Sequence, residues 1–141
     1  MIFQYMKKHP VVEKMMQEDA YSHWLQVERL EEGPGVCVLR MKVRAEMVNG
    51  FGIAHGAITY GFADSALAFA SNAHGRHSVS IETSISHLKP VKVGDVLTTH
   101  VEEKSLGNRL GVYHIELRNQ DKVKVALFQG TVYRKDTLWE V

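Results

Sequence analysis

Apolar positions along the chain recur with two different periods, which predict a few helices and many strands. Helical spacing after Pro10, a residue suited to a first helical turn, predicts a short helix over residues 10–19. Alternating apolar and polar positions, interrupted by turn residues such as Gly33-Pro34-Gly35, predict strands. The expected strands cover residues 24–30, 36–43, 79–89, 96–103, 110–118 and 123–134.

One long helix is predicted over residues 56–73, where nearly every residue is small or apolar. Runs of strands around a single helix predict an α+β fold in which an antiparallel sheet wraps that helix. We expect residues 1–141 to form one domain, with its core over residues 22–134. Two alternating sets are each expected to share one face of a strand, namely Tyr113, Ile115 and Leu117, and Val123, Val125 and Leu127.

Composition and charge exclude several classes of function. The formal net charge is +1 and no basic stripe is present, so we expect neither nucleic acid nor a membrane as a partner. Residues 1–8 lack the order of a signal peptide, and we expect a cytoplasmic protein. Cys37 is the single cysteine, which excludes an internal disulfide, and its apolar neighbours predict a buried, unreactive thiol. His74 and His77 lack neighbouring cysteine or carboxylate ligands, so we expect no metal and no cofactor.

Asp64 interrupts the apolar helix at a position where a carboxylate is unusual. Aspartate is a poor helix former outside the first turn and is rarely buried without a partner. Most buried helical carboxylates are structural partners of another group, but the neighbouring helical turns contain no cation. Apolar surroundings raise the pKa of a carboxyl group, which prepares it to act as a base or nucleophile.

The start of the same helix, Ala54-His55-Gly56-Ala57, is a candidate oxyanion hole. Its first-turn amides lack helical partners, and the small residues Gly56 and Ala57 let a ligand oxygen approach them. Asp64 lies about 12 Å further along the helix, too far to attack a carbonyl held at Gly56. Antiparallel helices of a two-fold dimer bring the two groups together. Small residues expected to permit that approach are Gly61, Ala63, Ala66, Ala68 and Ala70.

Three motifs together resemble the PaaI-like acyl-CoA thioesterases of the hotdog-fold superfamily. They are Asn49 to Ala57 with its His55-Gly56 pair, Ala63-Asp64-Ser65-Ala66, and Ser80 to Val91 closed by Gly94-Asp95. The resemblance covers residues 45–134. It implies an antiparallel sheet around one long helix, homodimers with a continuous sheet, and often tetramers built from two dimers.

The resemblance also implies the hydrolysis of an acyl-CoA thioester. The Gly56 amide would polarise the carbonyl, Asp64 of the other subunit would attack it or activate water, and Asn49 would help to place either the nucleophile or the substrate. His55 would lie near the thioester, and Ser80 matches a hydroxyl that some relatives place beside the acid. Ala57 departs from the glycine usual in the family, although its N–H survives. Further expected contacts to the substrate or CoA are Ala57, His87, Lys89, Asn108 and Arg109.

Two other functions remain open from the sequence. A hotdog hydratase or dehydratase would use His55 with Asp64 for proton transfer at carbon. A non-catalytic acyl-CoA-binding regulator would use the same pocket but would need no carboxylate at position 64. The acyl group is expected to be aromatic or of medium length, and Tyr60 or Phe62 are candidates to line its pocket.

Overall fold

The computed structural model describes residues 7–141; residues 1–6, which include most of the segment tested for a signal peptide, lie outside this range. The helices are α1 (Pro10–Glu18), α2 (Ala20–Leu25), the short 3-10 helix η1 (Ala45–Met47) and α3 (Gly56–Asn72). The strands are β1 (Glu28–Gly33), β2 (Val36–Lys42), β3 (Arg76–His87), β4 (Val96–Leu106), β5 (Leu110–Arg118) and β6 (Lys124–Leu138). Within the described range, no helix is both long and apolar enough to cross a membrane.

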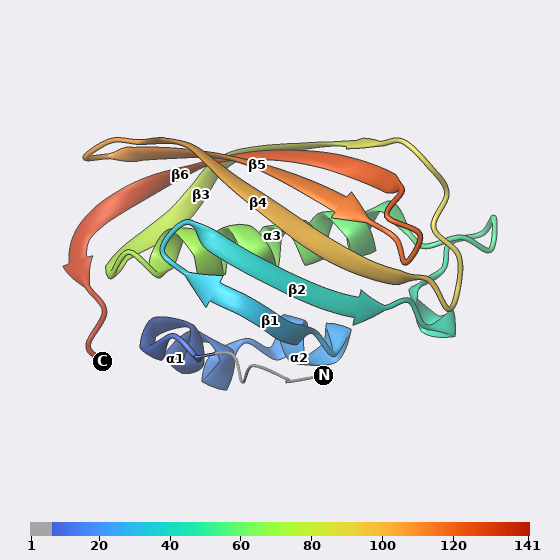
Figure 1. Cartoon of the computed structure of the whole chain (residues 1–141), viewed down its shortest axis with the longest axis horizontal. Coiled ribbons are helices and arrows are strands. Elements are labelled where there is room, and N and C mark those ends of the chain that lie inside the picture. The colour runs from blue at the N-terminus through green and yellow to red at the C-terminus, as the bar shows by residue number, and fades with distance from the viewer. Residues whose placement is uncertain (1–6) are drawn as a thin grey trace.

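The strands form one antiparallel sheet in the order β1-β2-β4-β5-β6-β3. The sheet curves around α3, and α1 and α2 lie beside the β1 edge (Figure 1). This is the predicted α+β architecture. Because β3 is bonded to β6 on one side only, its other side is an edge 12 residues long.

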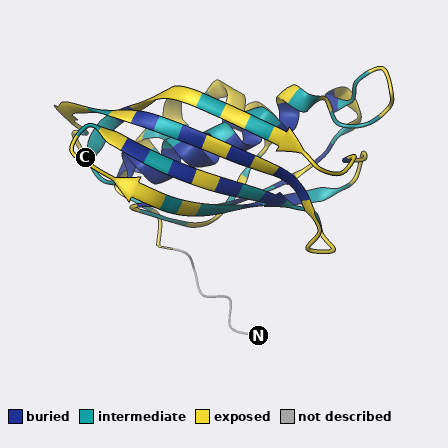
Figure 2. Ribbon diagram, turned by 90° about the horizontal axis from the view of Figure 1, so that it is seen from above, coloured by how far each residue is buried: buried dark blue, intermediate teal, exposed yellow. Residues whose placement is uncertain are grey.

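The core forms between α3 and the inner face of the sheet. On α3, Phe62 and Phe69 are fully buried, and on β5 the buried residues Tyr113, Ile115 and Leu117 alternate with more exposed ones, as predicted. Figure 2 shows this alternation along neighbouring strands. Burial of these side chains is the main source of stability for a domain of this size.

The strand expected over residues 24–30 is a helix followed by a strand. The Asp19 side chain caps α2 by accepting a hydrogen bond of 2.9 Å from the Ser22 N–H. The helix ends at Leu25, its C-cap Gln26 has a left-handed φ of 58°, and β1 then begins at residue 28. A capping aspartate therefore decided the local structure, where the apolar pattern had indicated a strand.

A bulge in β6 overturns the face predicted for Val123, Val125 and Leu127. Leu117 of β5 pairs with Ala126 and the next residue pairs with position 124, so Val125 is an extra residue in the ladder. Val125 and Ala126 are consequently both buried, whereas Val123 and Leu127 are each 41% exposed.

Small residues on α3 serve packing within one chain, and this corrects their predicted role. The Tyr21 side chain from α2 lies against Gly61, where a Cβ would overlap its hydroxyl group and ring. Ala63, Ala66 and Ala70 are fully buried in the core. Of the predicted set, Gly61 and Ala68 are half-buried, and because Gly61 is in contact with Tyr21, Ala68 is left for a contact with another helix.

Candidate active site

Asp64 lies half-buried on α3 and lines a cavity of about 370 Å³. Its pKa is raised above the ordinary value of 3.8, chiefly because burial disfavours the charged form and further because Asp19 repels it. Asp19 is held in place by Ser22, whose hydroxyl bonds the Asp19 carboxylate at 2.7 Å and the Ser65 hydroxyl at 2.8 Å. A carboxyl group with a raised pKa at the wall of a cavity is a candidate base or nucleophile.

Ser80 lines the same cavity as Asp64, so the structure brings these two predicted residues together. Most of the remaining wall is apolar. It includes Met15, Leu67, Ala68, Val79, Val132 and Trp139. Asp64 therefore faces a space suited to an apolar group, and the Ser80 hydroxyl belongs to the same cavity wall.

Gly56 lines a second cavity, of about 350 Å³, together with Asn49, His87 and Lys89. The His87 ring lies over Gly56, and its Cε1 would be 3.3 Å from a Cβ at that position. His87 Nε2 bonds the Thr59 hydroxyl at 2.7 Å. Four of the predicted site residues thus meet at the start of α3.

His55 caps α3 through its side chain. His55 Nδ1 accepts the Ala57 N–H at 3.0 Å, and the His55 carbonyl accepts the Ile58 N–H at 2.9 Å. The expected oxyanion role of Ala57 is therefore wrong, because the cap already uses its N–H. No hydrogen bond joins the Gly56 N–H to any part of residues 7–141, so this amide is available to a ligand. Because Nδ1 accepts, a neutral His55 carries its proton on Nε2.

Asn49 shapes the loop that leads into this cavity. Its side-chain oxygen accepts the Phe51 N–H at 2.9 Å, and its carbonyl accepts the Gly52 N–H at 3.0 Å. Because the side-chain oxygen is bonded to the loop, the Asn49 side chain lies along it. The NH₂ group of Asn49 is then left as a donor for a ligand.

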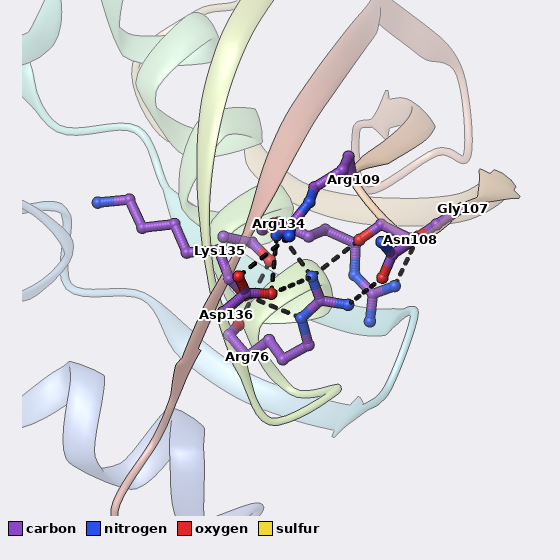
Figure 3. A network of polar contacts seen from close by, with 8 residues as sticks. Arg76, Gly107, Asn108, Arg109, Arg134, Lys135 and Asp136 are labelled. Atoms are coloured by element: carbon purple, nitrogen blue, oxygen red, sulfur yellow. Dashed lines mark hydrogen bonds and ion pairs between the residues drawn. The ribbon is translucent and has the colours of Figure 1, made fainter.

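Asn108 and Arg109 lie in the turn between β4 and β5 and line neither of these cavities. Arg109 pairs with Asp136 at 2.9 Å, and Arg76 donates to the Asn108 carbonyl at 2.8 Å (Figure 3). Arg76 and Arg109 both pair with the Asp136 carboxylate, and the Arg134 side chain donates to the Gly107 carbonyl, so several cationic side chains gather at this turn. The structure does not bring these residues to His87 and Lys89, and their contact with CoA stays a prediction.

Other residues singled out in the sequence have structural partners. His74 bonds Glu103 of β4 at 2.6 Å, so it does have a carboxylate partner, while His77 stacks on Trp139. Cys37 is buried, and burial raises the pKa of its thiol, as expected for an unreactive cysteine.

The aromatic residues expected near the acyl group lie elsewhere. Phe62 is fully buried in the core. Tyr60 packs edge-on against Phe128 and bonds the Thr83 hydroxyl. Neither residue lines the Asp64 cavity. That cavity is instead lined by Met15, His77 and Trp139, none of which the sequence marks for this role, because Met15 reads as part of an ordinary apolar helix face and Trp139 lies beyond the predicted core.

Comparisons with known proteins agree with this architecture. Residues 51–126 match the sequence profile of the thioesterase superfamily. The chain is 36% identical over 120 residues to acyl-coenzyme A thioesterase PaaI of Escherichia coli strain K12, covering 85% of this chain and 86% of that protein. The solved structure of the E. coli PaaI protein matches with a TM-score of 0.88 and 34% identity, covering 91% of this chain and 93% of that one. A hypothetical thioesterase of Streptococcus pneumoniae TIGR4, solved with coenzyme A, matches with a TM-score of 0.77 and 26% identity, over 80% of this chain and 91% of that one.

A six-stranded antiparallel sheet around one long helix, shared with these structures, defines the hotdog fold, as predicted. The chain belongs to the thioesterase superfamily, as a PaaI-like member. The predicted family and the prediction of a thioester hydrolase are both confirmed.

Proposed function

We propose that this protein hydrolyses an acyl-CoA with an aromatic or medium-length acyl group, at sites shared between two subunits. One observation carries the proposal. Asp64 and Gly56 are about 12 Å apart along α3 and line different cavities, so neither cavity alone contains both an acid and a free helix-start amide. In an antiparallel pair of α3 helices, the cavity of Asp64 faces Gly56 of the partner subunit.

The proposed chemistry begins with the thioester carbonyl held at the Gly56 N–H. As a nucleophile, the Asp64 carboxylate adds to the carbonyl carbon and expels the CoA thiolate, and water then hydrolyses the resulting anhydride. As a base, Asp64 takes a proton from water as its oxygen adds to the same carbon; the tetrahedral intermediate then breaks its C–S bond, and the CoA thiolate leaves and takes up the proton from Asp64. In either case the Gly56 amide stabilises the oxyanion, and Ser80 and Asn49 orient the reacting groups.

The remaining predicted residues line the path of CoA in this proposal. His87 and Lys89 share the Gly56 cavity, where Lys89 supplies a positive charge for a phosphate. His55 positions the helix start through its cap. Asn108 and Arg109 contact the nucleotide from the cationic β4–β5 turn.

A dimer through β3 is supported by the unpaired edge of the sheet. Val79 and Ile81 are 45% and 59% exposed on this strand. Exposed apolar side chains on an open sheet edge favour association with another strand. Pairing of β3 with β3 of a second copy would continue the sheet and set the two α3 helices side by side. A dimer of dimers would bury further surface.

A mixed dimer tests the shared site. Gly56 is the first residue of α3, a position that tolerates proline, and His55 already has the ψ of 141° that a residue before proline adopts. Gly56→Pro therefore removes the N–H but preserves the helix, and Gly56→Ala is the matched control that retains it. Each of Asp64→Asn and Gly56→Pro alone should lose activity.

Co-expression of the Asp64→Asn and Gly56→Pro chains, with two different N-terminal tags, isolates the dimer that contains one of each. This dimer should have one intact site, and thus about half of the wild-type rate of CoA release. An inactive mixed dimer would contradict the shared site. Wild-type protein that releases no CoA from phenylacetyl-, hexanoyl- or decanoyl-CoA would contradict the proposed substrate class.

A further inference from the structure

The cavity of Asp64 is closed by segments from both ends of the chain. Helix α1 contributes Met15, and the tail after β6 contributes Trp139. Both residues lie outside residues 51–126, the part that matches the thioesterase superfamily. The acid and this part of the cavity wall therefore come from different parts of the sequence.

Trp139 is fixed in this wall by three contacts. Its indole N–H donates to Asn72 Oδ1 at 2.9 Å, and its backbone N–H donates to the Gly75 carbonyl at 2.9 Å. The indole ring stacks on His77, with ring centroids 4.2 Å apart. Asn72 is itself 3% exposed and bonds the Ala68 carbonyl at 2.8 Å, so the indole is held by a rigid group at the end of α3.

Helix α1 is joined directly to the same tail. Lys14 Nζ donates to the Glu140 carbonyl at 2.6 Å, one residue after Trp139. On the inner face of α1, Val11 and Val12 are buried, which presents Met15 to the cavity. The C-terminus and α1 lie on the same side of the molecule in Figure 1.

The chemistry of the wall suits an acyl group better than the phosphates of CoA. Asp64 and His77 are the titratable residues along it, and neither Lys nor Arg lines it within the described range. The cavity volume of about 370 Å³ is close to the smallest volumes usual for small-molecule sites, which are about 300 Å³. An apolar cavity of about 150 Å³ already binds benzene. One aromatic ring or a medium aliphatic chain therefore fits, whereas a long lipid chain meets the wall.

We propose that Trp139 and Met15 form the end of the acyl pocket and set the longest acyl group that this protein accepts. The proposal rests on the proposed function, because it assigns the apolar part of the same substrate to the Asp64 cavity. Side chains from the two terminal segments thus determine specificity, whereas the acid that reacts lies on the central helix α3.

The specificity test compares kcat/KM for hexanoyl-, decanoyl- and palmitoyl-CoA. Trp139→Ala should raise the ratio of palmitoyl- to hexanoyl-CoA by at least about tenfold, because methylene groups then enter space that the indole fills. Met15→Ala should shift the ratio in the same direction by a smaller factor. Leu138→Ala, which removes an exposed neighbour on the same tail, is the control and should keep the wild-type ratio. Unchanged ratios in both cavity variants would overturn the proposal.

A binding measurement tests the same pocket without turnover and without changing its wall. In a Trp24→Phe protein, Trp139 is the remaining tryptophan. Its fluorescence should change on addition of S-decyl coenzyme A, a thioether that cannot be hydrolysed, and should change much less with S-ethyl coenzyme A. Equal responses to both compounds, or none to either, would overturn the proposed pocket.

The two experiments separate failure of this inference from failure of the proposed function. A fluorescence response to the decyl compound, in a protein that releases no CoA from any acyl-CoA, would contradict hydrolysis and support the pocket. Hydrolysis with a chain-length preference that Trp139→Ala leaves unchanged would contradict the pocket and support the function.

Discussion

Asp64 and Gly56 lie on the same helix, yet the carboxylate of one and the amide of the other open into different cavities. The separation follows from helix geometry, since eight residues span about 12 Å. Within a single chain the acid and the free helix-start amide therefore lie in separate cavities, and each cavity lacks what the other contains.

Replacement of the acid should separate activity from stability. Asp64→Asn should lower the rate of CoA release by at least about a hundredfold, since it removes the base or nucleophile. The same change should leave the melting temperature at neutral pH equal or higher. Between the ordinary and the raised pKa, the folded protein retains a proton that the unfolded chain has lost, so stability falls as pH rises through that window. Calorimetry and a CoA-release assay on the same sample check both effects, and a near-normal rate would exclude Asp64 from the chemistry.

The pH dependence of the reaction should reflect Asp19. The proposed mechanism needs the ionised Asp64 carboxylate, so it predicts a rate that rises with pH through a pKa above 3.8. Asp19→Asn removes the like charge while the amide oxygen can still cap α2, and should move this acid limb to lower pH. A pH profile of kcat/KM measures the shift. An acid limb that stays in place would show that the Asp19 charge does not act on the reacting group.

Asn49 should matter less than the acid. Asn49→Ala removes a donor at the Gly56 cavity and the oxygen that holds the Phe51 N–H, so we expect a smaller loss of rate than for Asp64→Asn. Gln120→Ala, at an exposed position remote from both cavities, provides the matched control. Equal losses from Asn49→Ala and Asp64→Asn would assign Asn49 a larger part in the chemistry.

Packing between Tyr21 and Gly61 predicts a coupled pair of substitutions. Gly61→Ala should destabilise the fold by about 1 kcal/mol, because the new methyl group displaces the Tyr21 ring. In a Tyr21→Ala background the same change should cost little or even stabilise, since alanine favours helix over glycine. Urea unfolding of the four proteins measures the coupling, and additive effects would contradict the observed contact.

The β3 edge should control the oligomeric state. Ile81→Lys places a charge among the exposed apolar residues of β3 and should shift the protein to a smaller species in sedimentation velocity. Leu30→Lys on β1, the opposite edge of the sheet, is the control and should leave the species unchanged. If Ile81→Lys leaves the wild-type sedimentation unchanged, the β3 dimer is wrong.

Sequence patterns predicted the sheet and the central helix because a single period persists over many residues there, as in Tyr113, Ile115 and Leu117. They failed where one residue changed the local geometry, at the Asp19 cap and at the Val125 bulge. The residues of the candidate site show the same contrast between regular patterns and local geometry. The acid and the glycine were visible as exceptions to a regular pattern, whereas the bond from Ala57 to His55 depends on a rotamer. Contacts between the chain ends depend on tertiary packing, so no local pattern indicated Trp139.

The tie between Lys14 and the Glu140 carbonyl has a practical consequence for anyone who purifies this protein. An affinity tag fused to Val141 begins three positions after Trp139, whose indole lines the cavity, so it could displace that ring. The apparent substrate range would then depend on the expression vector. Enzymologists should attach the tag before residue 7 and repeat any chain-length profile after proteolytic tag removal.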